Sequence, residues 1–190
     1  MKQYSYRSQK GFSLLEILTA LAIISIILAM AILNYGSILP NFKANSAMDQ
    51  LLYRLRSARE QAIAHRRQVQ VEFVGNNQIR MTEIWLTGIA PPPSTYSFEG
   101  GAQFITFAAL PDTPMAFGNA APVYFGGISG GPPIMKFTTN GSFIDGGNTL
   151  VNGTVFLGLP GRASTARAIT ILGATGRVRE YHWDGTQWQE

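Results

Sequence analysis

The residues of this chain whose types and spacing are suited to binding a ligand lie near its carboxyl end. Residues 173–183 are predicted to form a turn followed by a strand. Side chains two residues apart in a strand share one face, so Arg177, Arg179 and Tyr181 line up and Trp183 continues the row. Two guanidinium groups beside an aromatic ring can hold phosphates and stack on a base or a sugar.

Two further arginines, Arg162 and Arg167, lie in the loop before this strand and would widen the patch to four charges. Four phosphate contacts would make the affinity for a polyanion strongly dependent on salt. The alternative is a solvated strand whose arginines pair with Glu180 or Asp184. The sequence leaves both interpretations open.

Patterns typical of catalysis or metal binding are not found in the sequence. The two histidines, His65 and His182, are far apart, and neither has the spacing of a metal ligand. Neither a Gly-x-Ser-x-Gly elbow nor a phosphate-binding Gly-x-x-x-x-Gly-Lys loop occurs. Without cysteines, a thiolate metal site and disulfides are excluded. The sequence therefore predicts a protein that is not an enzyme and that holds neither a metal nor a cofactor.

One acidic residue, Glu16, lies in an otherwise uncharged apolar stretch, residues 12–33. As a helix these residues would span roughly 33 Å, about the thickness of the hydrocarbon core of a bilayer. Lys2, Arg7 and Lys10 precede the stretch, which predicts a cytoplasmic N-terminus and a body outside the cytoplasm. A carboxylate inside such a segment costs a few kcal/mol unless it finds a partner.

The positive charge of the whole chain is weak support for nucleic-acid binding. The formal net charge is +4, from 15 basic and 11 acidic residues. Without Lys2, Arg7 and Lys10 the balance is 12 basic residues against the same 11 acidic ones, so the remainder is nearly neutral. Local clusters of charge therefore matter more than the total.

The residues before the apolar stretch form a specific motif, Lys10-Gly11-Phe12-Ser13-Leu14-Leu15-Glu16. This motif resembles the processing site of type IV prepilins and pseudopilins. The resemblance implies that a prepilin peptidase cuts after Gly11 and methylates the new terminus, Phe12. It also implies that Glu16 pairs with the terminal amine of a neighbouring subunit during assembly. The alternative is a signal anchor in which Glu16 is incidental, on a protein of another class such as an enzyme outside the cytoplasm.

The elements that must position these residues divide the chain into four segments. We expect a leader at residues 1–11, a membrane and assembly half of a long helix at 12–40, an amphipathic half at 41–67, and a β-rich domain at 68–190. Pro40 is expected to bend or interrupt the helix. Strands are predicted at residues 68–74, 78–86, 104–110, 134–138, 154–159, 168–172 and 177–183. Residues 87–101 and 111–133 are predicted to be loops and turns.

A helix followed only by strands predicts an α+β fold in which an antiparallel sheet packs on the second half of a long N-terminal helix. The order of helix, hairpin and glycine-rich final hairpin is similar to the GspH/FimT branch of pseudopilins and minor pilins. The resemblance implies a structural subunit of a type IV pilus or of a type II secretion pseudopilus. Such a subunit is held in the bacterial inner membrane with a periplasmic body, and its partners are other pilin or pseudopilin subunits.

A second resemblance concerns the carboxyl end. Gly176-Arg177-Val178-Arg179 resembles the Gly-Arg-x-Arg element of FimT-type minor pilins that bind DNA in natural transformation. It implies that Arg177 and Arg179 contact double-stranded DNA, with Arg162 and Arg167 as further contacts. Other arginines, at positions 54, 56, 59, 66 and 67, are interpreted as the side of the helix that faces solvent or other subunits.

Overall fold

A computed structural model describes residues 11–108 and 110–190 of the chain, so the first ten residues of the predicted leader lie outside the described residues. The chain divides into two compact units, with the boundary between Leu39 and Pro40. Each unit is described by itself below.

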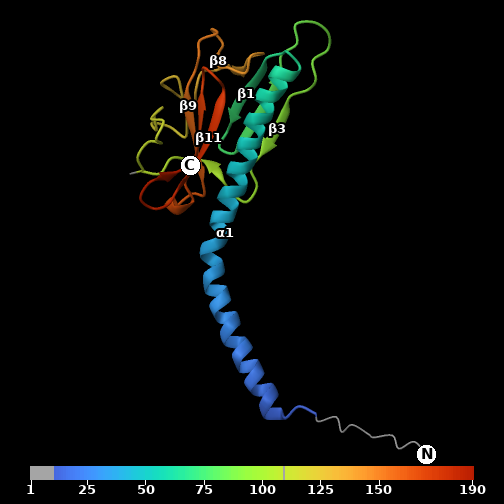
Figure 1. Cartoon of the computed structure of the whole chain (residues 1–190), viewed down its shortest axis with the longest axis vertical. Coiled ribbons are helices and arrows are strands. Elements are labelled where there is room, and N and C mark those ends of the chain that lie inside the picture. Colours follow the sequence, from blue (N-terminus) through green and yellow to red (C-terminus); the bar gives the residue numbers. More distant parts are fainter. Residues whose placement is uncertain (1–10, 109) are drawn as a thin grey trace, which may run out of the picture. The chain divides into compact units, whose positions relative to one another are not determined.

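The first element is a single α-helix, α1, which comprises Leu14–Ala64 (Figure 1). Pro40 lies inside it, so of the two outcomes expected at this proline, a bend or an interruption, the interruption is wrong. Proline removes one intrahelical hydrogen bond, but its fixed φ is compatible with a helix. The residues that follow Pro40 are tied down by core packing, and this packing outweighs the single missing bond.

The body, Pro40–Glu190, is organised around one stripe of α1. The buried apolar residues of this part of the helix recur every three or four positions: Ala44, Ala47, Met48, Leu51, Leu52, Leu55, Ala58 and Ala62. From Ala47 onward they belong to one core together with Val71 of the first sheet and Ile169 of the second. These residues form the apolar stripe expected of an amphipathic helix, and both sheets pack on it, but α1 ends at Ala64 and not at residue 67 as expected.

Two antiparallel sheets form the rest of the body, where one sheet was expected. The first has the order β3-β2-β1-β7-β8, with β1 Val69–Val74, β2 Gln78–Glu83, β3 Ser94–Ser97, β7 Met135–Phe137 and β8 Phe143–Asp145. The second has the order β12-β11-β10-β9-β5-β6, with β5 Val123–Phe125, β6 Ile128–Ser129, β9 Gly153–Gly158, β10 Arg167–Leu172, β11 Arg177–Trp183 and β12 Trp188–Gln189. A short strand, β4 Gln103–Phe104, also pairs with β9.

The predicted α+β class and both predicted hairpins, β1–β2 and β10–β11, are confirmed. The strand predicted at residues 104–110 is wrong, because β4 ends at Phe104. The segments predicted to be loops contain β3, β5 and β6, and β8 and β12 were not predicted. These elements have two to four residues each, too few to show a periodic pattern.

Strands β9 and β10 are buried along nearly their whole length because both faces of the second sheet are covered. One face contacts α1 through the main core. The other face is covered by a second core, formed by Phe156, Ala168, Tyr181 and Trp188. The loop between β4 and β5 packs against this core through Phe107, Leu110 and Met115. Strands covered on both sides are apolar in continuous runs instead of alternating.

One side chain of α1 connects turns of both sheets. The Nε of Arg59 donates to the carbonyl oxygen of Gly141, between β7 and β8, at 3.2 Å, and to that of Thr175, between β10 and β11, at 3.1 Å. Gly176, the next residue, has φ +60°, and a Cβ there would overlap the carbonyl oxygen of Gly141. The turn that leads into β11 therefore packs tightly against α1 and the β7–β8 turn.

This packing predicts that two glycine substitutions lower the free energy of unfolding by different amounts. Gly161→Ala meets no atoms within 4 Å and has φ +75°, so only backbone strain of about 1–2 kcal/mol is expected. Gly176→Ala has the same strain and also the overlap with Gly141, which adds about 1–3 kcal/mol. Chemical denaturation of the full chain in detergent, followed by circular dichroism, measures both costs. Equal losses of stability in the two variants would contradict the close packing at Gly176.

Candidate functional site

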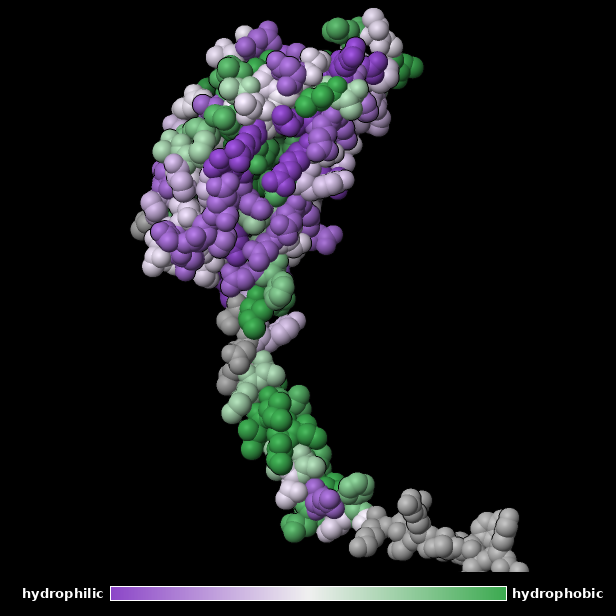
Figure 2. Space-filling model, in the orientation of Figure 1, coloured by the Kyte–Doolittle hydropathy of each residue, from purple (hydrophilic) through white to green (hydrophobic). Residues whose placement is uncertain are grey.

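The first candidate site is the N-terminal part of α1. Residues 11–32 are all exposed in the chain taken alone, and nearly all are apolar. The segment Leu14–Ile32 is long and apolar enough to cross a membrane. Figure 2 shows it as a band of hydrophobic side chains. Since a side chain such as Leu or Ile gains about 1.5–3 kcal/mol on full burial, covering this surface with lipid or with other helices is favourable.

Three residues of the predicted processing motif lie at the start of this helix. Gly11 and Phe12 precede its first residue, Leu14, and both are exposed, so the peptide bond between them is accessible. Glu16 lies in the first turn, where the helix dipole favours a negative charge. Among the residues that the structure describes, no cation pairs with its carboxylate. The processing and assembly roles expected of these residues stay predictions.

The second candidate site is a cationic hollow on the body. Arg177 is exposed at the start of β11 and lines this hollow, which has a volume of about 510 Å³, together with Arg56 and Arg59 of α1. Glu60 is the one carboxylate in the lining. Three guanidinium groups therefore converge on one depression that can take an anionic group.

The contribution of α1 to this hollow is not predicted from the sequence, in which the arginines of α1 are expected to face solvent or other subunits. Arg56 and Arg59 are more than 110 positions from Arg177, and only the packing of the β10–β11 turn on α1 brings them together. No local pattern in the sequence contains this information.

Arg179 lies on the same face of β11 as Arg177, as predicted, but it has a partner. Its Nη1 is 3.0 Å from the carboxylate of Glu190. The pairing expected with Glu180 or Asp184 is therefore replaced by one with the last residue. Strand β12 pairs with the end of β11 and brings Glu190 into reach.

The turn between β11 and β12 is held by Asp184. Its carboxylate accepts hydrogen bonds from the backbone N–H groups of Thr186 and Gln187 and from the side chain of Gln189. These bonds favour the ionised form, so the pKa of Asp184 lies well below its usual range. Asp184 thus contributes to the position of Glu190 beside Arg179 without pairing with an arginine.

The aromatic residue expected to stack beside the arginines is not accessible. Tyr181 is 2% exposed and belongs to the second core. Trp183 is half-buried, with its ring centroid 5.4 Å from that of Trp188. The expectation that Tyr181 could stack on a base is therefore wrong, because the loop before β5 covers this face of the sheet.

Arg167 is also buried, at 5% exposed. Its Nε donates to Asn45 of α1 at 2.7 Å, and its Nη1 donates to the carbonyl oxygen of Ala166 at 2.8 Å. Burial lowers the pKa of the Arg167 guanidinium. This residue ties β10 to α1, and the prediction that it widens an exposed patch is wrong.

Arg162 is exposed, next to the short helix η1, Ala163–Thr165. It precedes β10, whereas Arg177 pairs with Leu172 at the other end of that strand. A six-residue strand separates the two ends by about 17 Å. The structure therefore brings Arg177 together with Arg56 and Arg59, and not with Arg162 or Arg167.

The two histidines are both exposed. His65 is 57% exposed and lies 3.3 Å from Glu83, and His182 is exposed on β11. Residues 11–108 and 110–190 contain no group of three or more His, Cys, Asp or Glu side chains that could hold a metal ion.

Comparisons with known proteins identify the N-terminal motif. The family model described as the prokaryotic N-terminal methylation motif matches residues 6–32. No curated protein matches the chain. The type IV minor pilin FimU of Pseudomonas aeruginosa is 15% identical, with 77% of this chain and 92% of that chain covered and a TM-score of 0.48. The minor pseudopilin EpsH of the type 2 secretion system of Vibrio cholerae is 12% identical, with 74% and 97% covered and a TM-score of 0.46.

The motif matched at residues 6–32 includes Gly11, Phe12 and Glu16 and continues to the end of the membrane-spanning candidate, Leu14–Ile32. The chain thus carries the N-terminal methylation motif of type IV pilins.

Proposed function

We propose that this protein is a minor pilin or H-type pseudopilin, a non-enzymatic structural subunit of a type IV pilus or of a type II secretion pseudopilus. The observation that carries the proposal is the methylation motif at residues 6–32, whose residues from Leu14 onward form a helix with exposed apolar side chains up to Ile32. A subunit of either machine needs such a surface, because its helix must leave lipid and pack among other helices.

In this proposal the subunit first lies in the inner membrane. Lys2, Arg7 and Lys10 keep the N-terminus cytoplasmic, and the body lies in the periplasm. Prepilin peptidase cuts between Gly11 and Phe12, which the structure leaves exposed, and the amine of Phe12 is methylated. Removal of the leader leaves a positive terminus four residues before Glu16.

Assembly then moves the apolar part of α1 from lipid to a bundle of sister helices. Both environments are apolar, so the transfer of Leu and Ile side chains costs little. Glu16 supplies the specificity, because a carboxylate in an apolar surrounding costs a few kcal/mol unless an opposite charge lies beside it. The methylated amine of a neighbouring subunit is that charge, and it fixes the axial position of the incoming helix.

The variant Glu16→Leu tests this mechanism. Its leader should still be removed, so the intact mass should correspond to a chain that starts at methylated Phe12. Its incorporation into sheared filaments should fall at least about tenfold, because the pairing that sets register is worth a few kcal/mol. Mass spectrometry of the membrane-extracted protein and immunoblots of the sheared fraction measure the two effects.

A matched control is Glu60→Leu, which removes an exposed glutamate of the same helix within the body. This variant should be processed and incorporated like the wild type. Normal incorporation of Glu16→Leu would exclude the assembly role, and a mature protein that still starts at Met1 in cells with active prepilin peptidase would exclude the proposed function.

A second candidate function is capture of double-stranded DNA during natural transformation. The observation that favours it is the hollow lined by Arg56, Arg59 and Arg177. Guanidinium groups bind phosphate oxygens through paired N–H donors. Arg177 also lines a second, smaller hollow together with Arg179, whose exposed ion pair with Glu190 is weak, so Arg179 can contribute to binding beside Arg177.

Replacement of both Arg177 and Arg179 by alanine should abolish retention of a DNA duplex by the full chain in detergent at low salt. Fluorescence anisotropy over a salt series is the measurement. The dependence of log affinity on log salt should weaken by about 0.9 for each phosphate that the variant no longer neutralises. Glu190→Gln should increase the affinity because it frees Arg179.

Arg162→Ala is the control for this experiment, since it removes one positive charge at the other end of β10. It should leave the affinity nearly unchanged. If the double variant and Arg162→Ala reduce binding equally, DNA attraction is a matter of overall charge and the hollow is not a binding site.

A further inference from the structure

The loop between β2 and β3, residues 84–93, presents two uncovered apolar side chains. Leu86 is 97% exposed and Ile89 is 94% exposed, which are the highest values among the large apolar side chains that the structure describes. They exceed even Phe12, at 79%. Figure 1 shows the loop beyond the ends of β2 and β3, and Figure 2 shows hydrophobic atoms at this tip beside hydrophilic ones.

The base of this loop is held in place. The guanidinium of Arg67 lies over the ring of Trp85, 3.6 Å from its centroid, a cation–π contact. Gly88 lies on the same indole, since a Cβ there would be 3.6 Å from the ring. The N–H of Ile84 donates to the carbonyl oxygen of Gln68 at 2.8 Å, and three prolines stiffen residues 91–93. Leu86 and Ile89 are therefore displayed on a supported loop.

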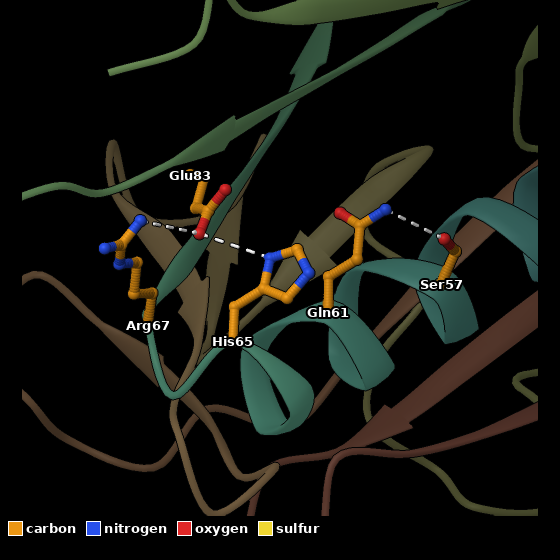
Figure 3. A network of polar contacts seen from close by, with 5 residues as sticks. All are labelled: Ser57, Gln61, His65, Arg67 and Glu83. Carbon is orange, nitrogen blue, oxygen red and sulfur yellow. Dashed lines mark hydrogen bonds and ion pairs between the residues drawn. The ribbon is translucent and has the colours of Figure 1, made fainter. Parts of the chain in front are cut away.

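The surroundings of the loop carry unequal charge. Glu83 lies between His65, at 3.3 Å, and Arg67, at 3.6 Å (Figure 3). Its carboxylate is largely buried, with 16% of the side chain exposed, and is already engaged by these two residues. Arg66 is exposed, with φ 51°, and no carboxylate pairs with it in the described parts of the chain. The surface beside the loop is thus positive.

A hollow of about 400 Å³ adjoins the loop and is lined by Arg66, Arg67, Leu86 and Thr139, among others. It combines two guanidinium groups with an apolar wall. Guanidinium groups match the planar geometry of a carboxylate. The hollow is therefore suited to an Asp or Glu side chain of another protein in which apolar residues lie beside that acid.

We propose that residues 84–93 form a docking loop for a second protein, one that covers Leu86 and Ile89 with an apolar pocket and places an acidic side chain beside Arg66. The chemistry of the hollow selects this partner. Leu86 and Ile89 are uncovered, so the partner must offer an apolar pocket, and the charge of Arg66 is exposed, so the partner must place an acid at the edge of that pocket. The inference does not depend on assembly through Glu16, since every residue involved lies in the body.

Site-specific photocrosslinking tests this inference. The full chain, with the photoreactive residue p-benzoylphenylalanine in place of Leu86, is made in its native cells and irradiated. We expect one protein adduct, which mass spectrometry identifies together with the crosslinked residue. The same substitution at Leu150, a 55% exposed apolar residue between β8 and β9, is the matched control and should give no such adduct.

The charge requirement is tested in the same cells. Arg66→Glu should reduce the adduct about tenfold or more, and a change of the acid nearest the crosslinked residue of the partner to Arg should restore it. Because Leu86 and Arg66 are both exposed, the melting temperature of each variant should equal that of the wild type. The inference is overturned by an adduct with lipid or with a second copy of this chain, by the absence of any adduct, or by an adduct that Arg66→Glu does not change.

Discussion

The structure of the body depends on the packing of one helix stripe against two sheets at once. Leu51, Leu55 and Ala58 are fully buried in the same core as residues of both sheets. Neither sheet closes on itself, and several of their strands have only two or three residues, so each sheet needs the helix to bury its apolar face. Polar contacts flank the stripe: Arg59 bonds to a turn of each sheet, and Arg167 bonds back from β10 to Asn45.

The features that the sequence predicted correctly mostly form a pattern within a short window. The apolar stretch, the helical stripe and the β1–β2 and β10–β11 hairpins each extend over six or more residues, so a continuous apolar run or a regular spacing is visible in them. Strands such as β4 and β12 contain two residues each and exist because a neighbouring strand offers hydrogen bonds, β9 for the one and β11 for the other. Such elements follow from tertiary contacts, so a local pattern could not predict them.

The same distinction explains the candidate site. Alternation in β11 correctly placed Arg177 and Arg179 on one face. Alternation does not tell, however, which side chains of that face are exposed and which are covered by other parts of the chain. Tyr181 is buried because the loop containing Phe107 and Met115 folds over that face. Arg167 is buried beside α1, where Asn45, 122 positions away, accepts its hydrogen bond. The partnership of Arg59 with the β10–β11 turn spans 116 positions. Long-range contacts therefore decide which arginines remain available to a ligand.

The engagement of the acidic residues explains how a nearly neutral body can still display cationic surfaces. Asp112, Asp145 and Asp184 each accept hydrogen bonds from two backbone N–H groups of their own turns, so their carboxylates are committed to loop structure. Glu83 is engaged by His65 and Arg67 beneath the 84–93 loop. Because these acids are occupied locally, Arg177 and Arg66 keep their charges exposed at two separate places on the body. Net charge is therefore a poor guide to binding in this protein, and the distribution of satisfied carboxylates is a better one.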